Sequence, residues 1–117
     1  MHSLTRPALT VLAAAALVAG ASAIAATPKA SCKAARQTFN DRCSMCHGEN
    51  GKGYAAIHTP DFTDPHWQAK HTDAQLISAV EHGVQAAGMM PSFQGQLTHA
   101  QIDALVRCVV RGFAAKK

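Results

Sequence analysis

The chain has 117 residues, a formal net charge of +4 and six aromatic side chains, which are four Phe, one Trp and one Tyr. Its charged fraction of 15% is too low for a disordered polyelectrolyte or a long coiled coil. The mild positive charge is too weak to indicate a nucleic-acid-binding protein. The length indicates one domain, but much of the 48% apolar fraction is alanine near the start. The remainder has few large side chains for a core, and so small a domain often needs a disulfide, metal or cofactor.

Residues 1–26 are typical of a secretory signal peptide. Arg6 supplies a positive charge ahead of an apolar run, and the small residues 21–23 form a cleavage pattern, which predicts cleavage near 23–26. An uncleaved membrane anchor is the alternative, but alanine and glycine make the segment poorly hydrophobic for that role. We therefore expect one exported domain over 27–117, with no membrane segment in the mature form, in an oxidising compartment where disulfides persist.

Periodicity and capping signals predict three helices in the remaining chain. Each predicted start has a hydroxyl side chain as its N-cap: Ser31, Thr72 and Thr98. The first two predicted helices end at Arg42 and Gly83, and the apolar positions of the last run to Phe113, with Gly112 and the tail 116–117 closing it. The segment 48–71 is rich in Gly, Asn, Pro and Asp and is predicted to be loop. No stretch has the alternating pattern of a strand, so the predicted fold class is all-α.

One motif indicates a specific chemistry. The residues from Cys43 to His47 read C-S-M-C-H, which matches C-x-x-C-H, the attachment motif for c-type haem. Two thiols three positions apart near a helix end can each reach one vinyl group of the porphyrin, and the adjacent histidine can bind the iron. We therefore expect Cys43 and Cys46 to form thioether bonds to one haem c, with His47 as an iron ligand. A thioredoxin-type dithiol and a zinc site are the alternatives, but no βαβ pattern surrounds the motif, and Cys32 and Cys108 are isolated.

A second iron ligand is expected from the loop between the second and third predicted helices. Met89 and Met90 lie there, and the Pro91 that follows restricts the backbone at Met90. Thioether sulfur is a soft ligand that favours Fe(II) and raises the reduction potential. Met90 is the predicted axial ligand and Met89 the alternative. A histidine ligand such as His82 or His99, an open coordination site, and methionine as core filler are the other readings.

With these motifs the sequence resembles the small monohaem class I cytochromes c of the bacterial periplasm. The resemblance covers about residues 30–113. It rests on the C-S-M-C-H box with Gly48 after it, on the loop 90–93 and on the terminal helix around 102–106. It implies a cytochrome c fold, in which three main helices and long loops surround one covalently bound haem.

The resemblance also implies roles for single residues. Phe39 and Leu105 match the contacts between the crossing N- and C-terminal helices of the family. Pro60 matches a proline whose carbonyl holds the imidazole of the iron-binding histidine. Trp67 lies where the family often has an aromatic residue near the haem propionates.

One departure from the family concerns the two remaining cysteines. The family's usual aromatic residue near the middle of the last helix is replaced here by Cys108. Cys32 lies one turn from Ala35, on the face of the first helix that the resemblance directs at the last one. We therefore expect a Cys32–Cys108 disulfide. Two separate buried thiols, or pairing between molecules, are the alternatives.

The implied function is electron transfer by a soluble, monomeric periplasmic protein that is not an enzyme. Such a protein would accept one electron from a dehydrogenase or a bc1-type complex and pass it to an oxidase or another cytochrome. Lysines around the exposed haem edge would attract acidic redox partners. One alternative is a dedicated haem subunit of a larger dehydrogenase or oxidase. Another is a haem peroxidase or sensor with a labile sixth ligand.

Overall fold

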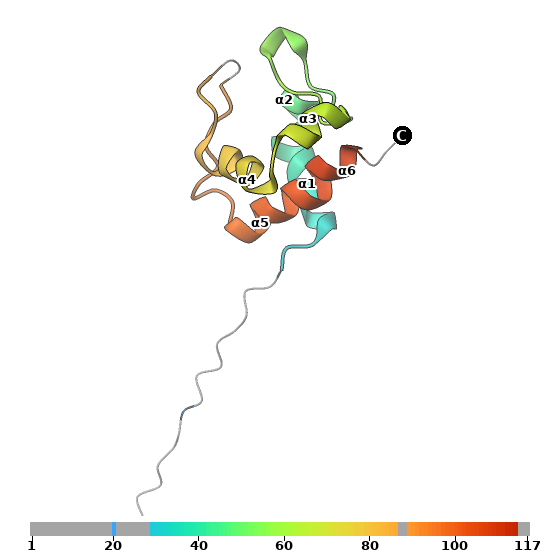
Figure 1. Cartoon of the computed structure of the whole chain (residues 1–117). Helices are drawn as coiled ribbons and strands as arrows, with labels where there is room; N and C mark the ends of the chain where they lie inside the picture. Colours follow the sequence, from blue (N-terminus) through green and yellow to red (C-terminus); the bar gives the residue numbers. More distant parts are fainter. Residues whose placement is uncertain (1–19, 21–28, 87–88, 115–117) are drawn as a thin grey trace, which may run out of the picture.

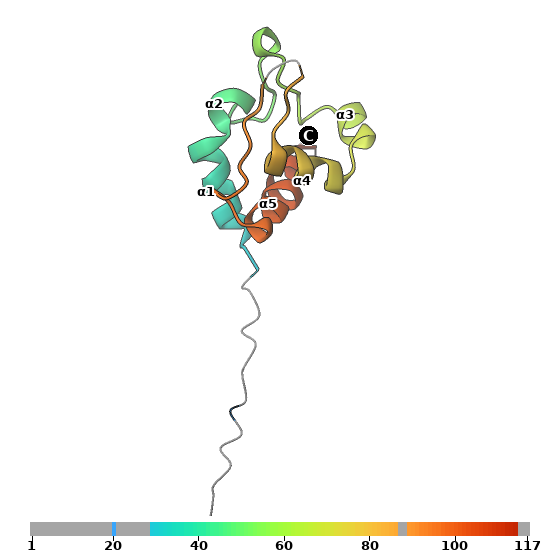
Figure 2. The same cartoon turned by 90° about the vertical axis from the view of Figure 1, so that its left-hand side faces the viewer.

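The computed structural model describes residues 20, 29–86 and 89–114, and within them the fold is helical (Figures 1 and 2). The elements in chain order are α1 (Cys32–Arg42), α2 (Ser44–His47), the 3₁₀ turn η1 (Ala55–Ile57), α3 (Pro65–Lys70), α4 (Asp73–His82), α5 (His99–Ala104), the π-helical η2 (Leu105–Val110) and α6 (Arg111–Ala114). The described residues form isolated β-bridges but no strand, so the all-α prediction is confirmed. The predicted signal peptide, apart from Gly20, lies outside the described residues.

The predicted helix starts are confirmed by the capping hydrogen bonds. Ser31 Oγ accepts from the backbone N–H of Ala34 at 3.1 Å, and α1 begins directly after it. Thr72 and Thr98 each form a complete capping box, in which the N-cap hydroxyl and the side chain three residues later exchange hydrogen bonds with backbone N–H groups. Since each cap satisfies N–H groups that a helix leaves unpaired, the three starts are determined locally.

One local prediction was wrong. The segment predicted as loop contains α3, which begins with Asp64 as N-cap, accepting from His66 N–H at 2.9 Å, and Pro65 in the first turn. Its six residues are too few for a periodic pattern, but Asp-Pro is a recognised helix start. The last helix includes Phe113, as predicted, and this residue is buried in the core.

The core lies where α1 crosses the C-terminal helix formed by α5, η2 and α6 (Figure 1). Phe39 is 2% exposed, and Val106 and Val109 are fully buried. The Phe39 and Phe113 rings lie 5.3 Å apart at 57°, within the range of favourable tilted aromatic pairs. Leu105 belongs to the same buried cluster, so the two residues that the resemblance assigns to the crossing are both there.

A disulfide joins Cys32 and Cys108, with a Cα–Cα distance of 5.4 Å. Cys32 is the first residue of α1, and Cys108 lies within the π-helical η2. A π-helical turn holds more residues than an α-helical one and changes the face on which later side chains lie. The sequence periodicity did not reveal this local widening. The disulfide links the two helices beside their buried crossing.

A charged network joins α3 and α4 to the C-terminal helix. Arg111 donates to Asp73 at 2.8 Å, to the backbone carbonyl of Gln68 at 2.9 Å and to that of His71 at 2.6 Å. Gln68 is buried and donates to the carbonyls of Phe62 (2.7 Å) and Val110 (2.8 Å). These bonds satisfy carbonyls around the end of α3 that would otherwise be buried unpaired.

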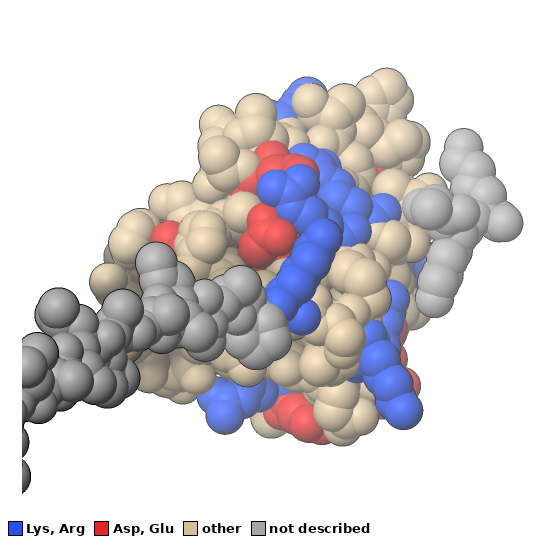
Figure 3. Space-filling model, turned by 90° about the horizontal axis from the view of Figure 1, so that it is seen from below, with Lys and Arg blue, Asp and Glu red and all other residues tan. Residues whose placement is uncertain are grey.

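The charged surface is mixed in sign. Figure 3 shows Lys and Arg side chains with Asp and Glu side chains among them on the lower face of the molecule. Arg107 illustrates this pattern, because it pairs with Asp103 at 2.7 Å and with Asp73 at 3.2 Å. Within the described residues, no helix is both long and apolar enough to span a membrane.

The disulfide is expected to contribute strongly to stability. It closes a loop with a sequence separation of 76, for which chain entropy predicts about 4 kcal/mol. The double substitution Cys32→Ala/Cys108→Ala should therefore lower the free energy of unfolding by up to about this amount. Denaturant unfolding of both proteins, with and without reductant, measures the loss.

The double variant supplies the control, because reductant should destabilise the parent protein and leave the variant unchanged. Alkylation followed by mass measurement tests the pairing directly. Two thiols that react without prior reduction, in addition to any at Cys43 and Cys46, would contradict it.

Candidate functional site

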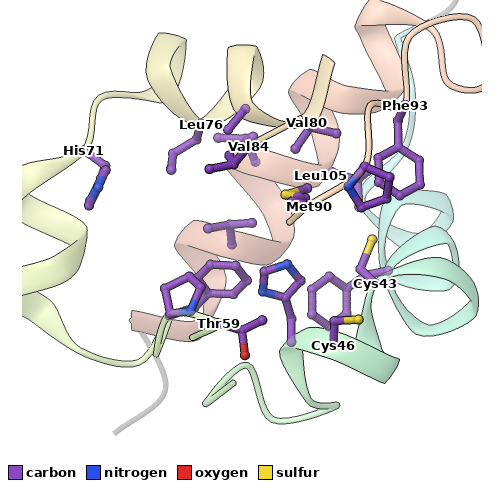
Figure 4. Close-up of a pocket in the computed structure, with 18 of the residues that line it drawn as sticks. Cys43, Cys46, Thr59, His71, Leu76, Val80, Val84, Met90, Phe93 and Leu105 are labelled. Carbon is purple, nitrogen blue, oxygen red and sulfur yellow. The ribbon is translucent and has the colours of Figure 1, made fainter. Parts of the chain in front are cut away.

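A cavity of about 700 Å³ lies between α1 and α2 on one side, α3 and α4 on another, and the C-terminal helix behind them (Figure 4). Its walls are mostly apolar, and the segments around residues 57–62 and 89–93 complete them. The volume lies in the range of small-molecule and cofactor sites. The polar and sulfur-containing groups that enter this cavity therefore identify its chemistry.

Cys43 and Cys46 lie at the same end of the cavity (Figure 4). Cys43 is both the C-cap of α1 and the N-cap of α2. The junction of the two helices therefore directs both cysteines to this end of the cavity. Burial raises the pKa of the Cys43 thiol to about 11. A thioredoxin-type cysteine needs a lowered pKa to act as a thiolate, so this environment argues against a dithiol redox site.

His47 ends α2 and lies beside the two cysteines in sequence and on the cavity wall. It is 9% exposed, and its ring stacks on Phe62 with centroids 4.8 Å apart and planes at 18°. Burial lowers the pKa of His47, which favours the neutral imidazole, the form that can bind a metal. Its Nδ1 is buried without a hydrogen-bond partner, and an orphaned polar atom of this kind needs an explanation.

The expected hydrogen bond from His47 to the Pro60 carbonyl is not formed. Nδ1 has no partner, because the ring is aligned with Phe62 instead. Pro60 does line the cavity, and its carbonyl lies against Gly53, where an added Cβ would be 2.5 Å from the oxygen. Gly53 has a φ of +64° and donates its N–H to the carbonyl of His47 at 2.9 Å. The loop after the motif therefore packs closely against the histidine without bonding its ring.

Met90 enters the cavity from the segment that follows α4 (Figure 4). Its backbone forms a two-way antiparallel bridge with Val84, at 2.9 and 3.0 Å. Further along, Phe93 and Gln94 donate to the carbonyls of Val80 and Glu81 at 3.0 and 3.1 Å. The segment is thus fastened to the end of α4 on both sides of Pro91.

Gly83 allows this attachment. It ends α4 with a φ of +77°, and a Cβ at this position would lie 2.6 Å from the carbonyl oxygen of Met90. Met89 is 77% exposed although it also borders the cavity. The half-buried Met90 is the methionine whose backbone is held on both sides, and its preference over Met89 as iron ligand stays a prediction.

His71 lies at the far end of the cavity from the cysteines (Figure 4), and Trp67 lines the cavity beside it. Their rings stack with centroids 4.4 Å apart, and Trp67 also lies 5.1 Å from the Phe62 ring. Trp67 therefore borders the cavity, as the resemblance implies. No motif in the sequence marks His71, which is the C-cap of α3 and has an extended backbone.

The alternative histidine ligands lie elsewhere. Neither His82 nor His99 lines the cavity. His99 instead pairs with Glu81 at 2.6 Å on the surface. Among the described residues, no group of three or more His, Cys, Asp or Glu side chains is arranged to hold a metal ion, so the zinc alternative has no support there.

Comparison with known proteins identifies the family. Residues 30–107 match the family described as "Cytochrome C oxidase, cbb3-type, subunit III". The chain belongs to this cytochrome c family. Membership of this family confirms the haem prediction made from C-S-M-C-H. The protein is a c-type cytochrome with covalently bound haem c and a role in electron transport.

The similar proteins are oxidase subunits and small cytochromes. The chain is 35% identical over 72 residues to the cbb3-type cytochrome c oxidase subunit FixP of Bradyrhizobium sp. (strain ORS 278), covering 62% of this chain and 24% of FixP. It is 34% identical over 83 residues to the subunit CcoP of Rhodobacter capsulatus, covering 65% of this chain and 27% of CcoP. The chain thus spans about a quarter of these relatives.

Two solved structures share the fold. The KustC0563 c-type cytochrome has 33% identity and a TM-score of 0.62, with 68% of this chain and 95% of that chain covered. The c-type cytochrome XoxG from Methylobacterium extorquens AM1 has 21% identity and a TM-score of 0.57, with 72% and 50% covered, and supports the fold alone. The cavity fits haem, because its walls are apolar, two thiols lie at one end and the buried His47 imidazole lines it beside them.

The close approach at Gly83 generates a prediction. Gly83→Ala should cost about 1 to 3 kcal/mol for a backbone with φ of +77° and ψ of 175°, a region essentially restricted to glycine, and about 1 to 3 kcal/mol more for displacing Met90 and Ser92. Gly95→Ala is the matched control, since Gly95 has a φ of +79° but nothing within 4 Å of the added Cβ. Denaturant unfolding of the holoproteins compares the two. Equal losses would show that the Met90 segment does not depend on the close approach at Gly83.

Proposed function

We propose that this protein is a periplasmic one-electron carrier whose haem iron is bound by His47 and Met90. The observation that carries the proposal is a buried imidazole, whose pKa burial lowers, on the wall of an apolar cavity beside two thiols. Cys43 and Cys46 are the proposed thioether positions, and the Met90 side chain enters the cavity from a different segment. Met89 is the alternative ligand.

In this proposal the protein binds the haem and surrounds it with a rigid cavity wall. Bound haem c supplies an iron that alternates between Fe(III) and Fe(II). His47 offers a neutral nitrogen held flat against Phe62, and Met90 offers a soft sulfur that favours the reduced state. The apolar walls exclude water, and the backbone bonds on both sides of Pro91 limit movement of the Met90 segment.

Two filled ligand positions distinguish a carrier from a haem peroxidase or sensor, which needs an open or labile site. The proposed export rests on the signal-peptide pattern of residues 1–26, with 27–117 as the mature, monomeric cytochrome domain. The proposed donors are a dehydrogenase or a bc1-type complex, and the proposed acceptors are an oxidase or another cytochrome.

A second candidate function is a haem subunit bound within a larger oxidase or dehydrogenase. It is favoured by the names of the relatives, which are subunits of cbb3-type oxidases, although the chain covers only about a quarter of them. Purification of the tagged full chain from its native host separates the two candidates. A soluble haem protein of monomer size supports the carrier, whereas co-purification with an oxidase at fixed stoichiometry supports the subunit.

Substitution of each methionine tests the sixth ligand. Met90→Ala should abolish the weak near-infrared sulfur-to-iron absorption of the oxidised protein, lower the reduction potential and allow the reduced iron to bind carbon monoxide. Met89→Ala is the matched control, because Met89 is the neighbouring residue and 77% exposed. It should retain the absorption.

The reverse outcome would assign the ligand to Met89. Retention of the absorption in both single variants would contradict methionine ligation by either residue. A high-spin spectrum in the unmodified holoprotein would contradict the carrier and favour the enzyme or sensor.

A further inference from the structure

The two ends of the cavity differ in chemistry. Cys43 and Cys46 lie at one end, and His71 lies at the opposite end (Figure 4). In haem c the vinyl-derived carbons that bond the cysteines occupy one half of the porphyrin, and the two propionate carboxylates occupy the other half. Attachment at the cysteine end therefore directs the carboxylate edge toward the end that contains His71.

His71 is held firmly in one orientation. Its Nδ1 lies 2.8 Å from the carbonyl of Trp67, and since a carbonyl only accepts, Nδ1 is the nitrogen that carries hydrogen. The ring stacks on Trp67, and Arg111 donates to the backbone carbonyl of His71 at 2.6 Å. Nε2 forms no hydrogen bond with the part of the chain that the structure describes, so it is the nitrogen available to the cavity.

The carboxylate nearest to His71 in the chain is already paired. From α4, Asp73 is paired with Arg111 of α6 at 2.8 Å and with Arg107 of η2 at 3.2 Å. Lys70, the last residue of α3, directly precedes His71 and is exposed. His58 borders the cavity from the loop after η1. The change in charge that His71 would sense is therefore the electron gained or lost at the iron. It would sense this change through the nearby propionate of the porphyrin.

We propose that His71 is a redox-linked proton site that pairs with a haem propionate. This inference rests on the proposed electron-carrier function. When the site gains one electron from its donor, the fraction of molecules in which His71 Nε2 has taken a proton from water increases, and the imidazolium donates to the carboxylate. When the electron leaves, the proton returns to water. An imidazole suits this role because it is the side chain that changes charge near neutral pH.

The coupling works in both directions. If the added electron increases the proton affinity of His71, then a bound proton increases the electron affinity of the iron by the same factor. A difference of about tenfold in proton affinity between the two oxidation states is the expected size. The protein would then transfer a fraction of a proton with each electron, and its reduction potential would fall as pH rises.

The experiment measures the reduction potential of the holoprotein between pH 5 and 9 by spectroelectrochemistry. The unmodified protein should show a sloping region, and His71→Gln should flatten it while retaining the low-spin spectrum. His66→Gln is the matched control, because His66 lies on the same helix α3 and is exposed. It should keep the slope.

A second measurement needs no variant. At a fixed pH between 6 and 7, the ¹⁵N signals of the His71 ring should move toward the protonated form when the protein is reduced. A potential that is independent of pH, a slope that survives in His71→Gln, or a ring unaffected by reduction would each overturn the inference. A surviving slope would assign the proton to the propionates themselves.

These outcomes are separate from failure of the proposed function. That failure would appear in the unmodified protein as the absence of a reversible one-electron couple or of a low-spin spectrum. Failure of the His71 inference alone would appear as a normal reversible couple whose potential does not depend on His71.

Discussion

The crossing of α1 over the C-terminal helix is the contact on which the rest of the molecule depends. Phe39, Val106 and Val109 are almost completely buried there, and the Cys32–Cys108 disulfide links the two helices beside them. Because α1 leads directly into the C-S-M-C-H motif, the crossing also positions both cysteines and His47. The same buried contact that stabilises the fold therefore sets one wall of the haem cavity.

The opposite wall is built differently. Met90 lies on no helix, and its place depends on backbone hydrogen bonds to the last turn of α4 and on the close approach at Gly83. One side of the site is thus held by side-chain burial and the other by backbone pairing. Backbone pairing places the sulfur without requiring a large apolar side chain, which suits a chain with only six aromatic residues.

The shortage of large apolar residues has a structural counterpart in the cavity. About 700 Å³ in the middle of a small domain is bordered by Phe62, Leu76 and Leu105, which belong to the buried cluster. Haem contributes the largest apolar surface to such an interior. The Arg111 network holds α3 at the far end, where the few polar groups of the cavity wall can meet the carboxylates of the cofactor.

The sequence by itself determined the features that depend on neighbouring residues. Hydroxyl caps at Ser31, Thr72 and Thr98 specify helix starts, and C-x-x-C-H specifies haem attachment, because each acts over one turn of chain. The short helix α3 was not predicted, because six residues are too few to show a hydrophobic period. Only Asp64 and Pro65 mark its start in the sequence.

Only the tertiary structure decided what depends on contacts between distant segments. Three features belong to this group. They are the π-helical turn at Cys108, the stacking of His47 on Phe62 without a bond to Pro60, and the position of His71 opposite the cysteines. The physical reason is packing: a ring or a turn adopts the orientation that buries it best among its neighbours, and these neighbours are brought together only when the chain has folded.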